Sequence, residues 1–145
     1  MHRYLGILAG LALLLPGLVA AQGRGRHERI TSTINDCVDR ANDFKHSLHG
    51  ALEHSRYRDT VREGQLDRDA KRLNKSMNKV GDSWNRDHDP AKTRHFVSEA
   101  IEVSRDINRT MVRGRLDPEI ERQWSTVRAE LNRLADVFEL PRIHW

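Results

Sequence analysis

Two histidines and a glutamate occupy positions i, i+3 and i+7 of one segment: His46, His49 and Glu53. On a helix, which turns by 100° per residue, these three side chains fall within about 60° of one another. Two imidazoles and a carboxylate suit zinc, copper or nickel. The spacing therefore predicts a candidate metal site on an exposed helix face. The alternative is a solvated polar face, because surface histidines bind metals weakly unless further ligands and supporting contacts fix them.

A second pattern is cationic, and its members are called the basic ridge below. Four basic residues follow a four-three-four spacing: Arg68, Arg72, Lys75 and Lys79. Like charges at i and i+4 cost a helix roughly 0.2–0.5 kcal/mol each, and no acidic residue shares this predicted face. The ridge suits an anionic partner, either an envelope protein or an anionic polymer such as a polysaccharide, or lipid headgroups. The lack of interleaved aromatic residues disfavours nucleic acid, and a solvated face without a partner is the alternative.

The cofactor motifs that helical bundles use are missing from the sequence. The single cysteine, Cys37, excludes a Cys-x-x-Cys-His haem site, and no glutamate has a histidine three residues further on, as di-iron bundles require. His27-Glu28 is not followed by the second histidine of a zinc protease. The sequence thus favours a non-enzymatic protein with no cofactor, and the alternative is zinc, copper or nickel bound at the candidate metal site.

The N-terminal residues have the features of a secretory signal peptide, and these features occur in the required order. A short basic start precedes an apolar run from Leu5 to Leu15, and small residues follow as far as Ala21. The run is shorter than the roughly 20 residues that a helix needs to span a bilayer. Residues 1–21 are therefore predicted to be a cleaved signal peptide, and residues 22–30 a flexible N-terminus. The mature chain is expected to be periplasmic or secreted and to lack a transmembrane segment.

The charge of the chain is mixed rather than strongly basic. Arg3 is the only one of the 25 Lys and Arg residues within residues 1–21, so 24 remain beyond them against 21 acids. The high isoelectric point therefore reflects a small excess on a densely charged surface. One cysteine allows no internal disulfide, so stability must come from an apolar core, in which Cys37 is expected to be buried.

The spacing of the apolar residues predicts the helices that would position the candidate metal site and the basic ridge. Between Leu66 and Trp84 the apolar side chains alternate at spacings of four and three, which places them on one narrow helix stripe. Asp89-Pro90 and Asp117-Pro118 each combine a capping aspartate with proline at the first helical position. Four helices are predicted: from about Thr31 to His54, from Asp67 to about Asn85, from Pro90 onward, and from Pro118 to about Glu139.

The junctions between these helices are short. Gly64 and Gly114 each precede a Leu-Asp pair, which predicts that a helix ends at each glycine. The repeat indicates either a duplicated hairpin or convergence on a common connection. Short connections favour antiparallel neighbours, so residues 31–145 are predicted to form one all-α domain, an up-down-up-down antiparallel four-helix bundle. Ile143 and Trp145 are expected to fold back and cap one end of it, with an exposed docking tail as the alternative.

Together these patterns predict an exported, non-enzymatic helical bundle. It would act by surface contact with an anionic or protein partner in the cell envelope, through the basic ridge. The alternative is a periplasmic metal-binding protein that uses His46 and His49. Both interpretations are compatible with an oligomer.

Overall fold

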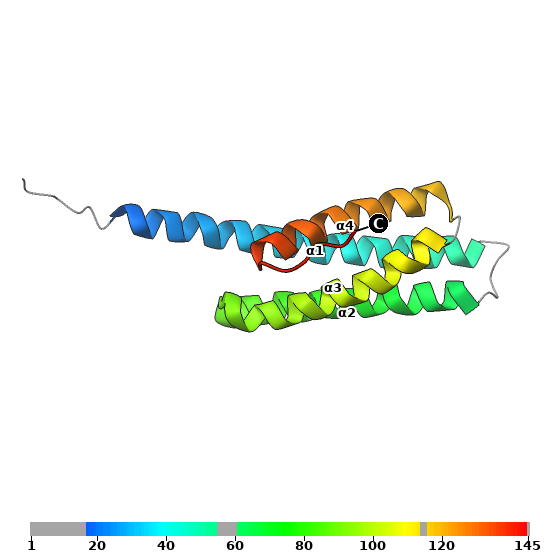
Figure 1. The fold of residues 1–145 in the computed structure, drawn as a ribbon, viewed down its shortest axis with the longest axis horizontal. Helices are drawn as coiled ribbons and strands as arrows, with labels where there is room; N and C mark the ends of the chain where they lie inside the picture. Colours follow the sequence, from blue (N-terminus) through cyan, green and yellow to red (C-terminus); the bar gives the residue numbers. More distant parts are fainter. Residues whose placement is uncertain (1–16, 55–60, 114–115, 145) are drawn as a thin grey trace, which may run out of the picture.

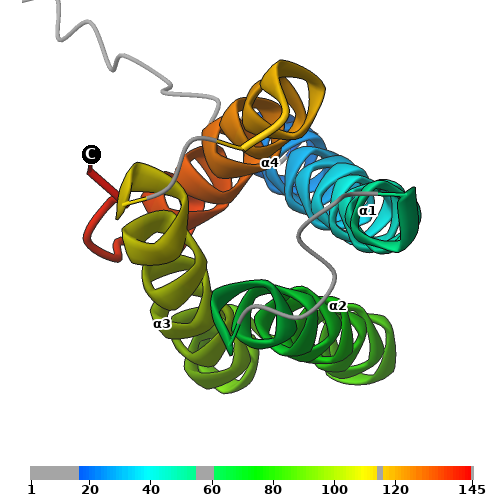
Figure 2. The same ribbon diagram turned by 90° about the vertical axis from the view of Figure 1, so that its right-hand side faces the viewer.

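The computed structural model describes residues 17–54, 61–113 and 116–144, which form four α-helices and no strand. The helices are α1 (Gly17–His54), α2 (Val61–Asp87), α3 (Pro90–Arg113) and α4 (Pro118–Val137). Each runs opposite to the one before it (Figure 1). Seen end-on they surround one core, and each helix packs against its neighbours in the order α1, α2, α3, α4 and back to α1 (Figure 2). The predicted all-α, four-helix architecture is confirmed for these residues.

The core is built from the apolar stripes that the sequence spacing predicts. All six predicted stripe residues of α2 are at most 1% exposed: Leu66, Ala70, Leu73, Met77, Val80 and Trp84. The stripe of α4 is buried in the same way: Ile120, Trp124, Val127, Leu131 and Leu134. Cys37 is buried on α1, as expected. Burial raises the pKa of its thiol, and the carboxylates of Glu130 and Asp36 raise it further, so the thiol stays protonated and unreactive.

Aspartate caps start two of the helices, as predicted. The Asp117 carboxylate accepts a hydrogen bond of 2.7 Å from the backbone N–H of Glu119 at the start of α4. The Asp89 carboxylate accepts one of 2.9 Å from the N–H of Ala91 at the start of α3. Each carboxylate satisfies an N–H group that has no partner within the first turn of its helix.

The start of α2 differs from the prediction. The helix begins at Val61, not at Asp67, and Gly64 lies inside it. A glycine within a helix costs roughly 0.5–1 kcal/mol relative to alanine, but the additional turn leads directly into Leu66, which is 1% exposed in the core. The prediction of a helix end at Gly64 is therefore wrong. The corresponding junction at Gly114 lies outside the described residues.

The N-terminal part of α1 also differs from expectation. Residues 22–30, predicted to be a flexible N-terminus, are helical and continuous with the rest of α1. Ile30 is 4% exposed and extends the apolar stripe by one turn. Thr31 accepts a hydrogen bond of 2.8 Å from the indole N–H of Trp84, which ties this turn to α2. The N-terminal part of α1 projects beyond the other three helices (Figure 1).

Candidate functional site

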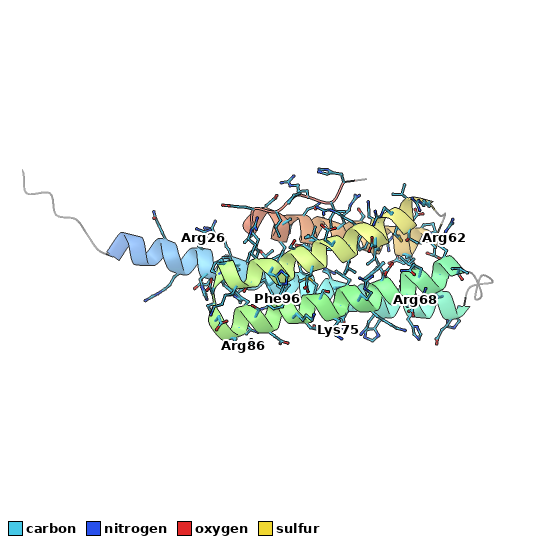
Figure 3. All side chains as sticks on the ribbon, turned by 60° about the horizontal axis from the view of Figure 1, so that its bottom comes forward. Arg26, Arg62, Arg68, Lys75, Arg86 and Phe96 are labelled. Carbon is cyan, nitrogen blue, oxygen red and sulfur yellow. The ribbon has the colours of Figure 1, made fainter. Side chains whose placement is uncertain are left out.

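The basic ridge lies on α2 opposite the face that packs into the core. Its four side chains are exposed, whereas Leu73 and Met77 on the other face are fully buried. Figure 3 shows Arg68 and Lys75 on this outer side of α2. A helix held by its apolar stripe presents such side chains at fixed spacing, with a rise of about 1.5 Å per residue.

Two members of the ridge are paired with acids. Arg72 Nη1 lies 3.1 Å from Asp69 Oδ1 of the same helix and 4.0 Å from Asp106 Oδ2 of α3. Lys79 Nζ lies 3.8 Å from Glu99 Oε2, also of α3. The charges of Arg72 and Lys79 are therefore partly offset, and the ridge is less cationic than its spacing alone indicates.

The other two members of the ridge are Arg68 and Lys75. The Arg68 guanidinium donates a hydrogen bond of 2.9 Å to the neutral side-chain amide of Gln65. Within the described parts of the chain, neither Arg68 nor Lys75 forms an ion pair with an acid. The two residues are two helical turns apart, about 10 Å along the axis. They are the part of the ridge that is best suited to an anionic ligand.

Asp69 is a buried acid beneath the ridge, and the sequence prediction missed it. Its side chain is 1% exposed. One carboxylate oxygen accepts a hydrogen bond of 2.9 Å from Gln65 Nε2, and the other accepts one from Arg72. A buried carboxylate requires such partners because burial removes its hydration. Its position beside the stripe residue Ala70 and three residues before Arg72 is the sequence signal that predicts this pairing.

The three residues of the candidate metal site are not brought to one point. His49 Nε2 lies 3.2 Å from Glu53 Oε1, and His49 Nδ1 lies 3.5 Å from Asp67 Oδ1 of α2. His46 instead borders a surface hollow on the α4 side, together with Glu119. In the described segments no group of three His, Cys, Asp or Glu side chains is placed to hold a metal ion. Metal binding by His46, His49 and Glu53 stays a prediction.

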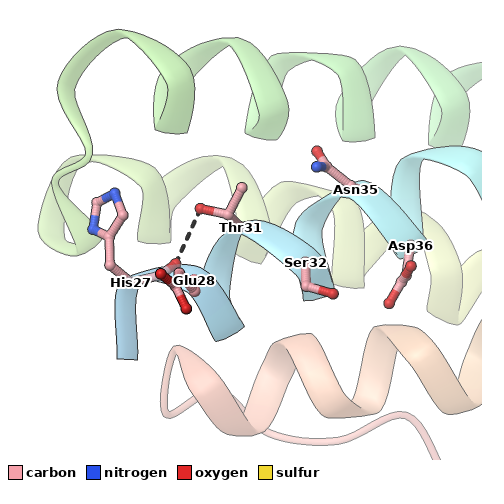
Figure 4. A pocket seen from close by; sticks show the side chains of 6 residues that line it. All are labelled: His27, Glu28, Thr31, Ser32, Asn35 and Asp36. Atoms are coloured by element: carbon pink, nitrogen blue, oxygen red, sulfur yellow. Dashed lines mark hydrogen bonds between the residues drawn. The ribbon is translucent and has the colours of Figure 1, made fainter. Parts of the chain in front are cut away.

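A second surface hollow follows the N-terminal half of α1 (Figure 4). It is lined by six residues of that one helix: His27, Glu28, Thr31, Ser32, Asn35 and Asp36. At its edge the imidazole of His27 stacks on that of His88, with ring centroids 4.5 Å apart, and also contacts Trp84. These rings pack the junction of α1 with the end of α2, which is a structural role.

Comparisons of this chain with protein-family models, with curated proteins and with solved structures give no match. Among the helices of the described residues, none is both long and apolar enough to cross a membrane. The functional proposal therefore rests on the surface of the bundle itself.

Proposed function

We propose that this protein is an exported, non-enzymatic helical bundle that contacts an anionic partner in the cell envelope through Arg68 and Lys75. One observation carries the proposal: these exposed cations have no acidic partner among the described residues, whereas Arg72 and Lys79 beside them do. Cations in register on a rigid helix create a local positive potential that the small net charge of the chain does not supply.

Export is part of the same proposal and rests on the N-terminal sequence. The basic start, the short apolar run and the small residues ending at Ala21 occur in the order that a signal peptidase requires. The exported chain is expected to begin at Gln22 or a near neighbour. N-terminal sequencing of the protein from a cell-envelope fraction measures this, and recovery of only the full-length chain from the cytosol would contradict it.

The binding proposal predicts a position-dependent response to charge reversal. The probe is a sulfated polysaccharide, heparin, immobilised on a column and eluted with rising salt. Wild-type protein should be retained at low salt and released as salt rises, because exposed charges are screened beyond roughly 8 Å at physiological ionic strength. The double variant Arg68→Glu plus Lys75→Glu should elute at clearly lower salt, with an unchanged helical circular dichroism spectrum.

A matched control variant distinguishes binding at the basic ridge from an effect of net charge alone. Arg24 and Arg26 are exposed on the projecting part of α1, and reversing both to Glu changes the net charge by the same amount. This control variant should elute closer to wild type than the ridge variant does. Equal elution of the two variants would mean that retention follows net charge alone, and the proposed contact on α2 would be wrong. The same pair of variants can then be compared in capture of partners from envelope extract.

A further inference from the structure

The C-terminal segment, residues 138–144, forms a strap over the seam between α3 and α4. Beyond Val137 the chain turns back and runs antiparallel to α4 and parallel to α3 (Figures 1 and 2). The strap lies between these two helices and forms hydrogen bonds with side chains of both. The prediction that Ile143 caps one end of the bundle is wrong, because Ile143 lies along the seam. Trp145 lies outside the described residues.

Side chains of α3 bind the main chain of the strap. Arg94 donates hydrogen bonds of 3.0 and 3.2 Å to the carbonyl oxygens of Phe138 and Glu139. Further along α3, two more residues continue the series: Arg105 donates to the carbonyl of Pro141 at 3.3 Å, and Asn108 donates to that of His144 at 2.8 Å. These contacts recognise an extended backbone rather than particular side chains.

Asn132 of α4 binds the strap from the other side. Its Oδ1 accepts a hydrogen bond of 2.7 Å from the N–H of Ile143, and its Nδ2 donates one of 3.1 Å to the carbonyl of the same residue. This paired contact imitates the pairing of two strands, in which main-chain bonds supply affinity and side-chain pockets supply specificity. The side chain of Ile143 is 3% exposed and joins the core. The seam therefore binds a peptide backbone and the buried side chain of Ile143, and Leu140 of the strap also packs against the core.

Asn108, whose side chain binds the strap, is itself held in place by the core. Asn108 is 4% exposed, and its Oδ1 accepts a hydrogen bond of 3.0 Å from the indole N–H of Trp124. This bond leaves the amide NH₂ group of Asn108 directed at the strap carbonyl. A donor held in this way before its ligand arrives is typical of a binding groove. At the exposed rim, Arg142 of the strap itself donates two hydrogen bonds to the carboxylate of Asp136 of α4, and these bonds lower the pKa of Asp136.

The turn that returns the strap to the seam is a helix C-cap. Glu139 has a φ of 54°, in the left-handed region that non-glycine residues rarely adopt, and the N–H of Leu140 donates a hydrogen bond of 2.8 Å to the carbonyl of Ala135 across the turn. The strap is therefore joined to α4 through a connection of only a few residues, and exchange of an identical terminal segment between copies is a low-cost route to a dimer.

We propose that the α3–α4 seam is a peptide-binding groove that the strap of the same chain fills, and that the strap of a second copy can fill instead. A second copy is the occupant because its strap carries the isoleucine and the backbone that the groove is seen to bind. Reciprocal exchange of two straps would form a closed, twofold symmetric dimer. The proposal is independent of the basic ridge, which lies on α2.

The first test uses a fluorescently labelled peptide of residues 139–144 and the full-length protein. In wild type the attached strap competes at an effective concentration on the order of millimolar, so saturable binding should need millimolar peptide. The full-length variant Ile143→Asp, whose own strap cannot bury a charge, should bind the peptide at least tenfold more tightly. The variant Ile143→Ala gives the same comparison with a milder change, and circular dichroism checks that both stay helical.

Two controls make the peptide test specific. A peptide with Ile143→Asp should not bind any of these proteins, and adding Asn132→Ala to the Ile143→Asp protein should abolish the gain in affinity. Equal binding of the two peptides, or no binding to wild type at millimolar concentration, would overturn the proposal even if both protein variants failed to fold.

The second test examines exchange between copies. Ile143→Asp protein has an empty groove, and Asn132→Ala protein has a weakly held but intact strap. A mixture of the two should sediment as a heterodimer, whereas each variant alone should remain at the mass of one chain. Absence of the heterodimer from the mixture would overturn the occupation of the groove by a second copy.

Discussion

Replacing Leu73 by alanine should lower the free energy of unfolding by about 2–5 kcal/mol, and Leu131→Ala should cost a similar amount. Leu73 is 0% exposed on α2 and Leu131 is 1% exposed on α4. Each substitution removes buried methyl groups and leaves a cavity, because the helices around it are held by their other core contacts and can close the space only in part. Urea denaturation followed by circular dichroism measures both effects.

Two exposed valines provide the matched control. Val61 is 88% exposed on α2, and Val112 is 58% exposed near the end of α3. Val61→Ala and Val112→Ala should each change the free energy of unfolding by less than about 0.5 kcal/mol, because surface substitutions away from special features do so. A result in which the leucine and valine variants lose the same stability would contradict the placement of the core.

The helices and their stripes could be predicted because both depend on local sequence. A spacing of four and three from Leu66 to Trp84 selects one helix face whatever packs against it. The capping aspartates, Asp89 and Asp117, act within their own first turns. The start of α2 could not be predicted in this way, because glycine is a poor helix former by propensity, yet α2 continues through Gly64.

The candidate site could be predicted only in part, since its members lie on one helix but their partners do not. The four-three-four spacing correctly places the basic ridge on the outer face of α2. It says nothing about Glu99 and Asp106, which α3 brings to Lys79 and Arg72. The sequence predicted that the C-terminal segment folds back, but its course along the α3–α4 seam could not be predicted for the same reason. Its recognition by Asn132 exists only after α4 has packed and the chain has turned back.

The basic ridge contains two kinds of cation: those paired with an acid, and those without an acidic partner among the described residues. Measurements of stability should distinguish the two kinds. Arg72→Glu should lower the free energy of unfolding by about 3 kcal/mol, the lower end of the range for breaking a buried ion pair. The lower end applies because Arg72 itself is 58% exposed, whereas its partner Asp69 is 1% exposed. The substitution removes one of the two groups that bind the Asp69 carboxylate and places a second carboxylate beside it. Lys75→Glu should change stability by less than about 0.5 kcal/mol, since Lys75 has no acidic partner among the described residues.

A double-mutant cycle identifies Asp69 as the cause of this difference. In the Asp69→Asn background the buried charge is gone, so most of the cost of Arg72→Glu should disappear. Urea denaturation of the four proteins in the cycle, with Lys75→Glu measured beside them, gives the coupling energy. An Arg72→Glu protein as stable as the Lys75→Glu protein would show that Asp69 does not depend on Arg72, and Arg72 would then be available to a partner. A large loss in Arg72→Glu that is absent from Lys75→Glu would show that the fold uses the charge of Arg72. Arg68 and Lys75, which have no acidic partner among the described residues, are then the ridge residues to test for binding.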